Sequence, residues 1–309
     1  MCVVLAPAAS ISRIFRSSAQ LGVAQVLLAK DSRWAQRFSI FAGASGGALA
    51  ATVCALLPHS RIADFAKSAG CRGESFNALA DALAGAGAFP ISAGAAEGAT
   101  AKQSLFLSAT HCRTGTNALF SRFGSNAKLQ RCLLASAAIP SDFHPFDLLQ
   151  RGRRPTYAEA GGIIVPPDCE SDGGLMAAVR DARTDGTLPF SPHGEAYVDG
   201  GITNTAPLLA EACDAHTLTV SPIGGPQGCL QAPSASQPGH YHLAPLDQSL
   251  RVPGVAPRLA GMRCYLSVDS LRALRASVGA SPRTLKRWYE CGVADAEQFL
   301  ARHEAPPDT

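Results

Sequence analysis

The stretch FSIFAGASGGALAATVCALLP, residues 38–58, decides the fold that we expect for this chain. It opens with an apolar, strand-like run at residues 38–42. It closes with an alanine-rich, helix-forming run at residues 48–57 that Pro58 ends. Between the two runs lies GASGG, residues 43–47, which is a G-x-S-x-G pattern. In this context the pattern predicts a serine held on a sharp turn between a strand and a helix.

This turn indicates an activated serine nucleophile. The glycines leave room where the strand and the helix crowd the turn. The N-terminus of the new helix directs backbone N–H groups toward any oxyanion that develops at the serine. A purely structural glycine-rich turn is the alternative. The residues assigned to this elbow are Gly43, Ser45, Gly46 and Gly47.

The same stretch carries no charge over 21 residues, which is long enough for a membrane-spanning helix. Glycines and serines interrupt it, however, and its apolar residues fall into two blocks. The flanking charges, Arg37 before it and Arg61 after it, give no clear orientation signal. We therefore expect a buried strand followed by a buried helix, which produces the same apolar run.

Composition sets broad limits on the protein. The chain has 309 residues, of which 47% are hydrophobic and 17% charged, so a sizeable core is expected and global disorder is not. Its net charge of +3 is too small to indicate nucleic-acid binding. No two of the ten cysteines lie within four residues of each other, which excludes zinc ribbons and C-x-x-C redox pairs. We expect most of them to be reduced and buried.

The beginning of the sequence lacks the pattern of a secretory signal, so we expect an intracellular protein that is not secreted. Residues 1–30 contain no acidic residue and include Arg13, Arg16 and several serines. An organellar targeting segment is one interpretation of this composition. The other is a ragged first strand at residues 11–15, followed by a helix at 20–30.

The rest of the chain alternates between strand-like and helix-like runs. This order predicts an α/β layered fold with a mainly parallel central sheet flanked by helices. Two stretches rich in turn-forming residues, 151–194 and 223–258, are interpreted as loop insertions. The expected strands are 105–110, 196–198 and 217–220, and the expected helices are 61–88, 127–138, 268–278 and 282–302.

A nucleophilic serine needs a base, and two Asp-Gly-Gly triplets offer one. Asp199 ends an apolar strand, where parallel sheets place their sites, whereas Asp172 lies in polar surroundings typical of a turn. A direct contact between Asp199 and Ser45 would limit the need for a histidine. A triad that uses His240 or His242 remains an alternative. The full set of histidines is His59, His111, His144, His193, His216, His240, His242 and His303.

Three segments in this order resemble the patatin-like phospholipases: GASGG at 43–47, LASAAIP at 134–140 and YVDGG at 197–201. Residues 220–222 and 288–300 are similar to the adiponutrin, or triacylglycerol-lipase, branch of that family. The resemblance covers nearly the whole chain and implies one acyl-hydrolase domain at residues 15–302, with a segment of uncertain order at 1–14 and a tail at 303–309.

The resemblance implies a lipid acyl hydrolase that cleaves carboxylic esters through an acyl-enzyme. By this resemblance Ser45 is the nucleophile and Asp199 the general base of a Ser-Asp dyad, supported by Gly200 and Gly201. It implies no catalytic histidine, no metal and no cofactor. The implied partner is a lipid substrate, met in the cytoplasm or at a peripheral membrane or lipid-droplet surface.

One segment departs from the family pattern. Where the family has a glycine-rich turn that supplies oxyanion donors, we align residues 15–22, FRSSAQLG. Ser17 and Ser18 are the donors available there, and Gly22 fits a later helix position better than the turn. Losing one oxyanion donor typically lowers kcat by about 10²–10³-fold. The alternative function is therefore a catalytically weakened, lipid-binding protein with the same fold. A conventional α/β-hydrolase with a histidine is a third.

The basic cluster RGRR, residues 151–154, has two interpretations. It could contact anionic lipid headgroups. The other interpretation is a solvated loop, which is the usual role of a charge run.

Overall fold

The computed structural model describes a defined part of the chain. The described residues are 2–5, 15–29, 32–65, 104–123, 125–139, 162–166, 194–204, 207, 217–220, 240–243, 258–259, 262–263 and 281–303. The expectations that lie outside them include Asp172, the basic cluster at 151–154, the helix at 268–278, and the part of the helix at 61–88 beyond Phe65. The histidines at 144, 193 and 216 lie outside them as well.

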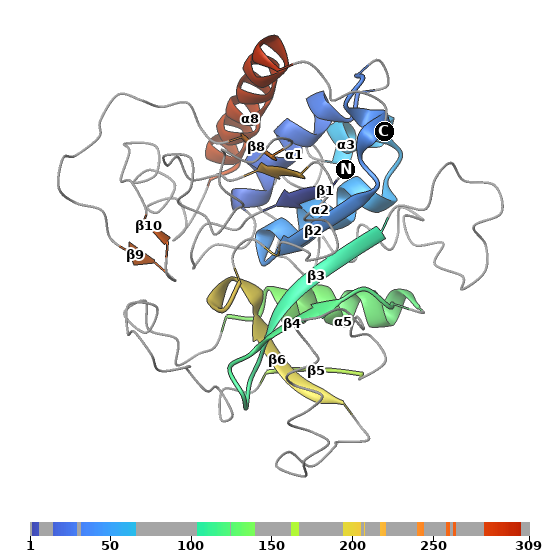
Figure 1. Ribbon diagram of the computed structural model, residues 1–309, viewed down its shortest axis with the longest axis vertical. Helices are drawn as coiled ribbons and strands as arrows, with labels where there is room; N and C mark the ends of the chain where they lie inside the picture. Colours follow the sequence, from blue (N-terminus) through green and yellow to red (C-terminus); the bar gives the residue numbers. More distant parts are fainter. Residues whose placement is uncertain are drawn as a thin grey trace.

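The described strands form one eight-stranded sheet and a separate two-stranded ribbon, β9–β10 (Figure 1). The order in the large sheet is β5-β6-β3-β2-β1-β7-β8, with β4 also paired to β3. The strands are β1 (Cys2–Leu5), β2 (Ile40–Ala44), β3 (Ser104–His111), β4 (Asn117–Phe120), β5 (Ile163–Val165), β6 (Glu195–Asp199), β7 (Thr217–Val220), β8 (His240–Leu243), β9 (Arg258–Leu259) and β10 (Met262–Arg263).

The chain is an α/β protein, as predicted, but its sheet is mixed. Among the described strands, the four pairings that join β3, β2, β1, β7 and β8 are parallel. The three that join β4, β6 and β5 to the sheet are antiparallel. The turn at residues 112–116 is too short for the crossover that a parallel partner needs, so β4 must run back along β3.

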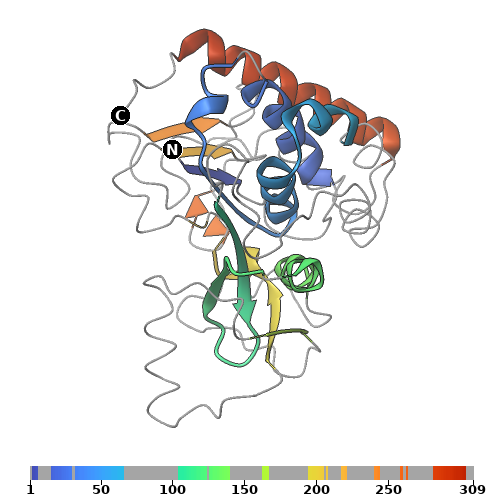
Figure 2. The ribbon, with the colours of Figure 1, turned by 90° about the vertical axis from the view of Figure 1, so that its right-hand side faces the viewer.

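Helices cover the sheet in two groups (Figure 2). The helix α8 lies along α1, and α1 also packs against α2 and α3, beside the parallel strands. The helix α5 packs instead against β3, β5 and β6. The helical segments are α1 (Phe15–Leu27), α2 (Gly46–Leu56), α3 (His59–Phe65), α5 (Asn126–Ser136), α8 (Pro282–Arg302) and the 3₁₀ turns η1 (Ala35–Arg37) and η6 (Gly200–Ile202).

The stretch at residues 38–58 forms the strand, turn and helix that its sequence predicts. Ile40–Ala44 is β2 and Gly46–Leu56 is α2, and residues 46–54 of α2 are all buried. Because residues 46–54 are buried all round, this helix has no solvated face, which explains why its sequence carries no charge. No helix within the described ranges combines the length and the apolar character that crossing a bilayer requires.

The N-terminal part differs from expectation. The first described strand is Cys2–Leu5, which pairs with β2 on one side and β7 on the other, so residues 2–5 lie inside the sheet. Phe15, predicted to end a strand at 11–15, begins α1 instead. Residues 11–14 of that expected strand lie outside the described residues.

Two stretches predicted to be loop insertions contribute strands. Within 151–194, Ile163–Val165 pairs antiparallel with β6. Within 223–258, His240–Leu243 pairs parallel with β7, so His240 and His242 lie on a strand and not in a loop. Both strands are edge strands of three or four residues, and such short runs stand out poorly from turn-rich neighbours.

The contact between α1 and α8 is close. A Cβ at Gly22 would collide with the backbone oxygen of Tyr289, and one at Gly292 would collide with the backbone oxygen of Ala19. Glycine at these two positions lets the helix backbones touch directly. Gly22 is therefore a helix residue in the interface with α8, in agreement with the prediction that it belongs to a helix.

Candidate active site

Ser45 stands on the turn between β2 and α2 in a strained backbone conformation. Its φ is 53° and its ψ is −126°, and it is the one non-glycine residue with a positive φ in the described part of the chain. Such conformations cost about 1–3 kcal/mol and persist only where the surrounding structure imposes them. A Cβ at Gly43 would collide with the backbone of Gly47, which explains why the elbow needs a glycine before the serine.

Asp199 lies next to Ser45, although 154 residues separate them in the sequence. The Ser45 hydroxyl donates a hydrogen bond of 2.7 Å to Oδ2 of Asp199. The backbone N–H of Gly201 donates one of 2.7 Å to Oδ1, so each carboxylate oxygen has a donor. Asp199 is 5% exposed, and short hydrogen bonds of this kind are strong in such surroundings.

Three neighbouring strands create this contact. Ala44 of β2 is in register with Ser108 of β3, and Ala109 of β3 is in register with Asp199 of β6. The serine and the aspartate are therefore brought to the same level on either side of β3. The chain then turns at Gly200, where a Cβ would collide with the Ser108 carbonyl, so only glycine allows η6 to start there.

The C-terminal turn of α5 contacts both residues. The Ser45 N–H donates to the Ser136 carbonyl at 3.1 Å and to the Ser136 hydroxyl oxygen at 3.0 Å. The Ser136 hydroxyl itself donates to the Ser108 carbonyl at 2.6 Å. Two residues further on, the Ala138 carbonyl accepts a 2.8 Å bond from the Asp199 N–H. Sequence analysis marked residues 134–140 as a motif but assigned them no role.

A buried polar cluster holds Asp199 from the other side, and sequence analysis missed it. The Thr110 hydroxyl donates to the Asp199 carbonyl at 2.8 Å and lies 2.9 Å from the Thr203 hydroxyl. The Asn117 amide nitrogen donates to Ser108 Oγ at 2.7 Å and to Thr203 Oγ1 at 3.1 Å. The sequence signal for this cluster is the presence of polar residues, Ser108, Thr110 and Asn117, in otherwise apolar strands.

The oxyanion donors need a corrected assignment. Residues 15–22, which we had aligned with the glycine-rich turn, form the first turns of α1, so Ser17 and Ser18 are helical. The strand β1 ends at Leu5, which is in register with Gly43, two residues before Ser45. The residues between β1 and α1 are 6–14, and they lie outside the described residues. Their sequence contains no glycine.

The N-terminus of α2 follows Ser45 directly. Gly46 is the first residue of the helix and Gly47 the second, and both are buried. The dipole of a helix favours negative charge at its N-terminal end. This end of α2 can stabilise an oxyanion at Ser45.

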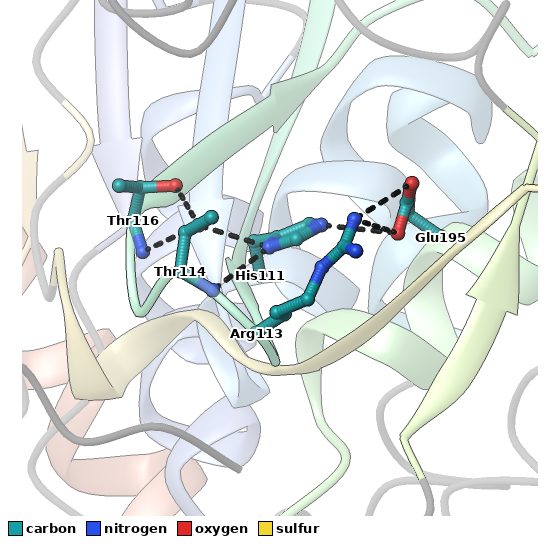
Figure 3. A network of polar contacts seen from close by, with 5 residues as sticks. All are labelled: His111, Arg113, Thr114, Thr116 and Glu195. Atoms are coloured by element: carbon teal, nitrogen blue, oxygen red, sulfur yellow. Dashed lines mark hydrogen bonds and ion pairs between the residues drawn. The ribbon is translucent and has the colours of Figure 1, made fainter. Parts of the chain in front are cut away.

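His111 belongs to a second polar network (Figure 3). Its Nδ1 accepts the backbone N–H of Thr114 at 3.1 Å, and its Nε2 lies 3.4 Å from Oε2 of Glu195. Since a backbone N–H can only donate, the neutral ring carries its hydrogen on Nε2 and donates to Glu195. Arg113 pairs with the same carboxylate at 3.4 Å. This network closes the turn between β3 and β4.

The strand β8, which carries His240 and His242, lies at the edge of the sheet, with β7 and β1 between it and β2. Within the described part of the chain, no three side chains of His, Cys, Asp or Glu come together to hold a metal ion. Of the four described cysteines that are free, Cys54, Cys112 and Cys132 are buried as expected, whereas Cys291 is exposed. Burial raises the pKa of the Cys54 thiol to about 12.

Comparison of the sequence with models of known protein families found no match, and comparison with curated proteins found none either.

Proposed function

We propose that this protein is a serine ester hydrolase that uses Ser45 as nucleophile and Asp199 as general base. The observation that carries the proposal is the 2.7 Å hydrogen bond from the Ser45 hydroxyl to Asp199, made by a serine in a strained turn at the N-terminus of a helix. A nucleophile in contact with a base, beside donors for an oxyanion, is what acyl transfer requires.

In this reaction Ser45 Oγ attacks the ester carbonyl carbon while its proton passes to Asp199. The bond from that carbon to the alcohol oxygen then breaks, and the proton moves to the departing oxygen. Water attacks the resulting acyl-enzyme in the same way, with Asp199 taking its proton. The carboxylic acid leaves and Ser45 regains its hydrogen.

The proposed substrate class is a lipid acyl ester, of phospholipid or acylglycerol type. Its support is the resemblance of segments 43–47, 134–140 and 197–201 to the patatin-like phospholipases. The proposal includes the layered fold of that family and action in the cytoplasm or at a membrane or lipid-droplet surface. Direct contact between serine and aspartate suits a dyad without histidine, which is the arrangement the resemblance implies.

A fluorophosphonate probe tests the nucleophile, because it reacts with activated serines. Wild-type protein should be labelled and should hydrolyse a short-chain nitrophenyl ester. Ser45→Ala should abolish both signals. Undiminished labelling of the Ser45→Ala variant would contradict the assignment.

A second candidate function is a weakened, lipid-binding protein with the same fold. The observation that favours it is the absence of glycine from residues 6–14, which join β1 to α1 in the sequence. A glycine-rich turn grafted into residues 6–14 should then raise kcat far more than it lowers KM, because oxyanion donors act mainly in the transition state. Turnover of a natural glycerolipid by the wild type at about 10 s⁻¹ or more would exclude this candidate.

A further inference from the structure

We infer that the C-terminal turn of α5 sets the geometry of the dyad, with the Ser136 hydroxyl as the positioning group for Ser45. This inference rests on the proposed function, because it concerns how the same serine and aspartate are held. Ser136 acts through the Ser45 backbone and is therefore a positioning residue.

The backbone of Ser45 is strained. A φ of 53° is unfavourable for a serine, so the surrounding contacts must hold it. The Ser45 N–H is held by two acceptors of one residue, the carbonyl and the hydroxyl oxygen of Ser136. That pair of bonds fixes the direction of the Ser45 peptide group, and with it the direction in which Oγ leaves the turn.

The Ser136 hydroxyl is itself oriented. It donates at 2.6 Å to the Ser108 carbonyl, so its lone pairs remain for the Ser45 N–H. Ser136 is fully buried, where such a bond has no competition from water. One hydroxyl thus joins α5, β3 and the elbow.

The same turn also holds the base. The Ala138 carbonyl accepts the Asp199 N–H at 2.8 Å. The Ser136 carbonyl, at the end of α5, lacks a partner within the helix, and the Ser45 N–H supplies one. Ala138 lies two residues beyond the end of α5. Two positions two residues apart on one rigid turn therefore fix both ends of the 2.7 Å bond between Ser45 and Asp199.

Ser136→Ala tests the inference because it removes one hydroxyl and keeps the backbone acceptor. We expect kcat for a nitrophenyl ester, and the rate of fluorophosphonate labelling, to fall by about 10–100-fold, since small displacements of reacting groups cost up to about 10²-fold. KM should stay within about twofold, because the hydroxyl is fully buried. Ser136→Cys introduces a residue of similar size with a weaker donor. Its kcat and labelling rate should lie between those of Ser136→Ala and wild type.

Thr52→Val is the matched control. Thr52 is also fully buried, and its hydroxyl donates at 2.8 Å to the Ala48 carbonyl within α2, the helix that follows Ser45. Its loss should lower the melting temperature about as much as Ser136→Ala does while leaving kcat within about twofold. A merely structural role for Ser136 predicts equal kcat in both variants.

The outcomes separate this inference from the proposed function. If wild-type protein is not labelled at Ser45, the proposed function fails. If wild type is labelled and Ser136→Ala reacts within twofold of it, or Thr52→Val slows labelling equally, the positioning role fails. If Ser136→Ala does not unfold cooperatively, Ser136→Cys takes its place in the comparison. A labelling rate equal to that of wild type in Ser136→Cys would then overturn the inference.

Discussion

The two ends of β6 carry carboxylates in different surroundings. Glu195, at the start of the strand, lies beside the cationic side chain of Arg113 and the ring of His111. Asp199, at the end, accepts a hydrogen bond from the Ser45 hydroxyl. Figure 3 shows the first of these arrangements. A carboxylate paired with a cation holds two strands together, whereas a carboxylate facing a hydroxyl can receive that hydroxyl's proton.

The largest expected effect is that of Asp199→Asn. An amide cannot take the proton of Ser45, so hydrolysis should fall by about 10²–10⁴-fold, the usual contribution of general base catalysis. Steady-state kinetics with a nitrophenyl ester measures this loss. If His240→Ala or His242→Ala proves equally damaging, the dyad must be replaced by a triad.

Thr110→Val should have an intermediate effect. The variant keeps the shape of the side chain but removes the hydroxyl that donates to the Asp199 carbonyl. The loss of one intramolecular hydrogen bond costs about 0.5–1.5 kcal/mol, which denaturant unfolding would show. We expect kcat to fall by about tenfold as the end of β6 loosens, because positioning errors slow reaction. An unchanged kcat with lowered stability would show that this contact does not orient the carboxylate.

Glu195→Gln should have a smaller effect on catalysis than either. Its amide oxygen can still accept from His111, and the lost pairing with Arg113 is weak because that side chain is 38% exposed. We expect activity within about twofold of wild type and a stability loss below about 1 kcal/mol. Activity and thermal melting measured together test this. A catalytic loss like that of Asp199→Asn would mean that the two ends of β6 do not differ as described.

The smallest effect concerns the thiol of Cys54, whose pKa is raised by burial. With its pKa raised to about 12, the thiol stays neutral and unreactive at pH 9, whereas exposed Cys291 should be alkylated there. Because the folded pKa lies above the value of 9.0 for a free thiol, its contribution to stability is complete below pH 9 and is lost as pH rises toward 12. Mass spectrometry after iodoacetamide treatment checks the first claim, and rapid alkylation of Cys54 in folded protein would contradict it.

Some of this arrangement is predictable from local sequence. Between an apolar strand-like run and a helix-forming run, the sequence GASGG at residues 43–47 predicts a sharp turn. The strand, the elbow and the helix therefore follow from the local pattern. Asp199 was also predictable, because it ends an apolar strand and is followed by two glycines. Both signals lie within a few residues, where backbone conformation and hydrophobic pattern are closely linked.

The rest depends on contacts between distant segments. Ser45 and Ser136 are 91 residues apart, and Thr110 and Asp199 are 89 apart, so no local pattern reveals either bond. The antiparallel half of the sheet was missed because β5 is a short edge strand among turn-forming residues. The strand at Cys2–Leu5 was missed because it is also short, with four residues.

The direct backbone contact between α1 and α8 has a consequence for biosynthesis. Gly22 and Tyr289 are about 270 residues apart, and ribosomes add about 5–20 residues per second. The early helix therefore emerges tens of seconds before the helix that will cover it. During that interval its buried face, with Leu21 and Val23 among its residues, has no α8 to pack against and is a surface for chaperones to protect.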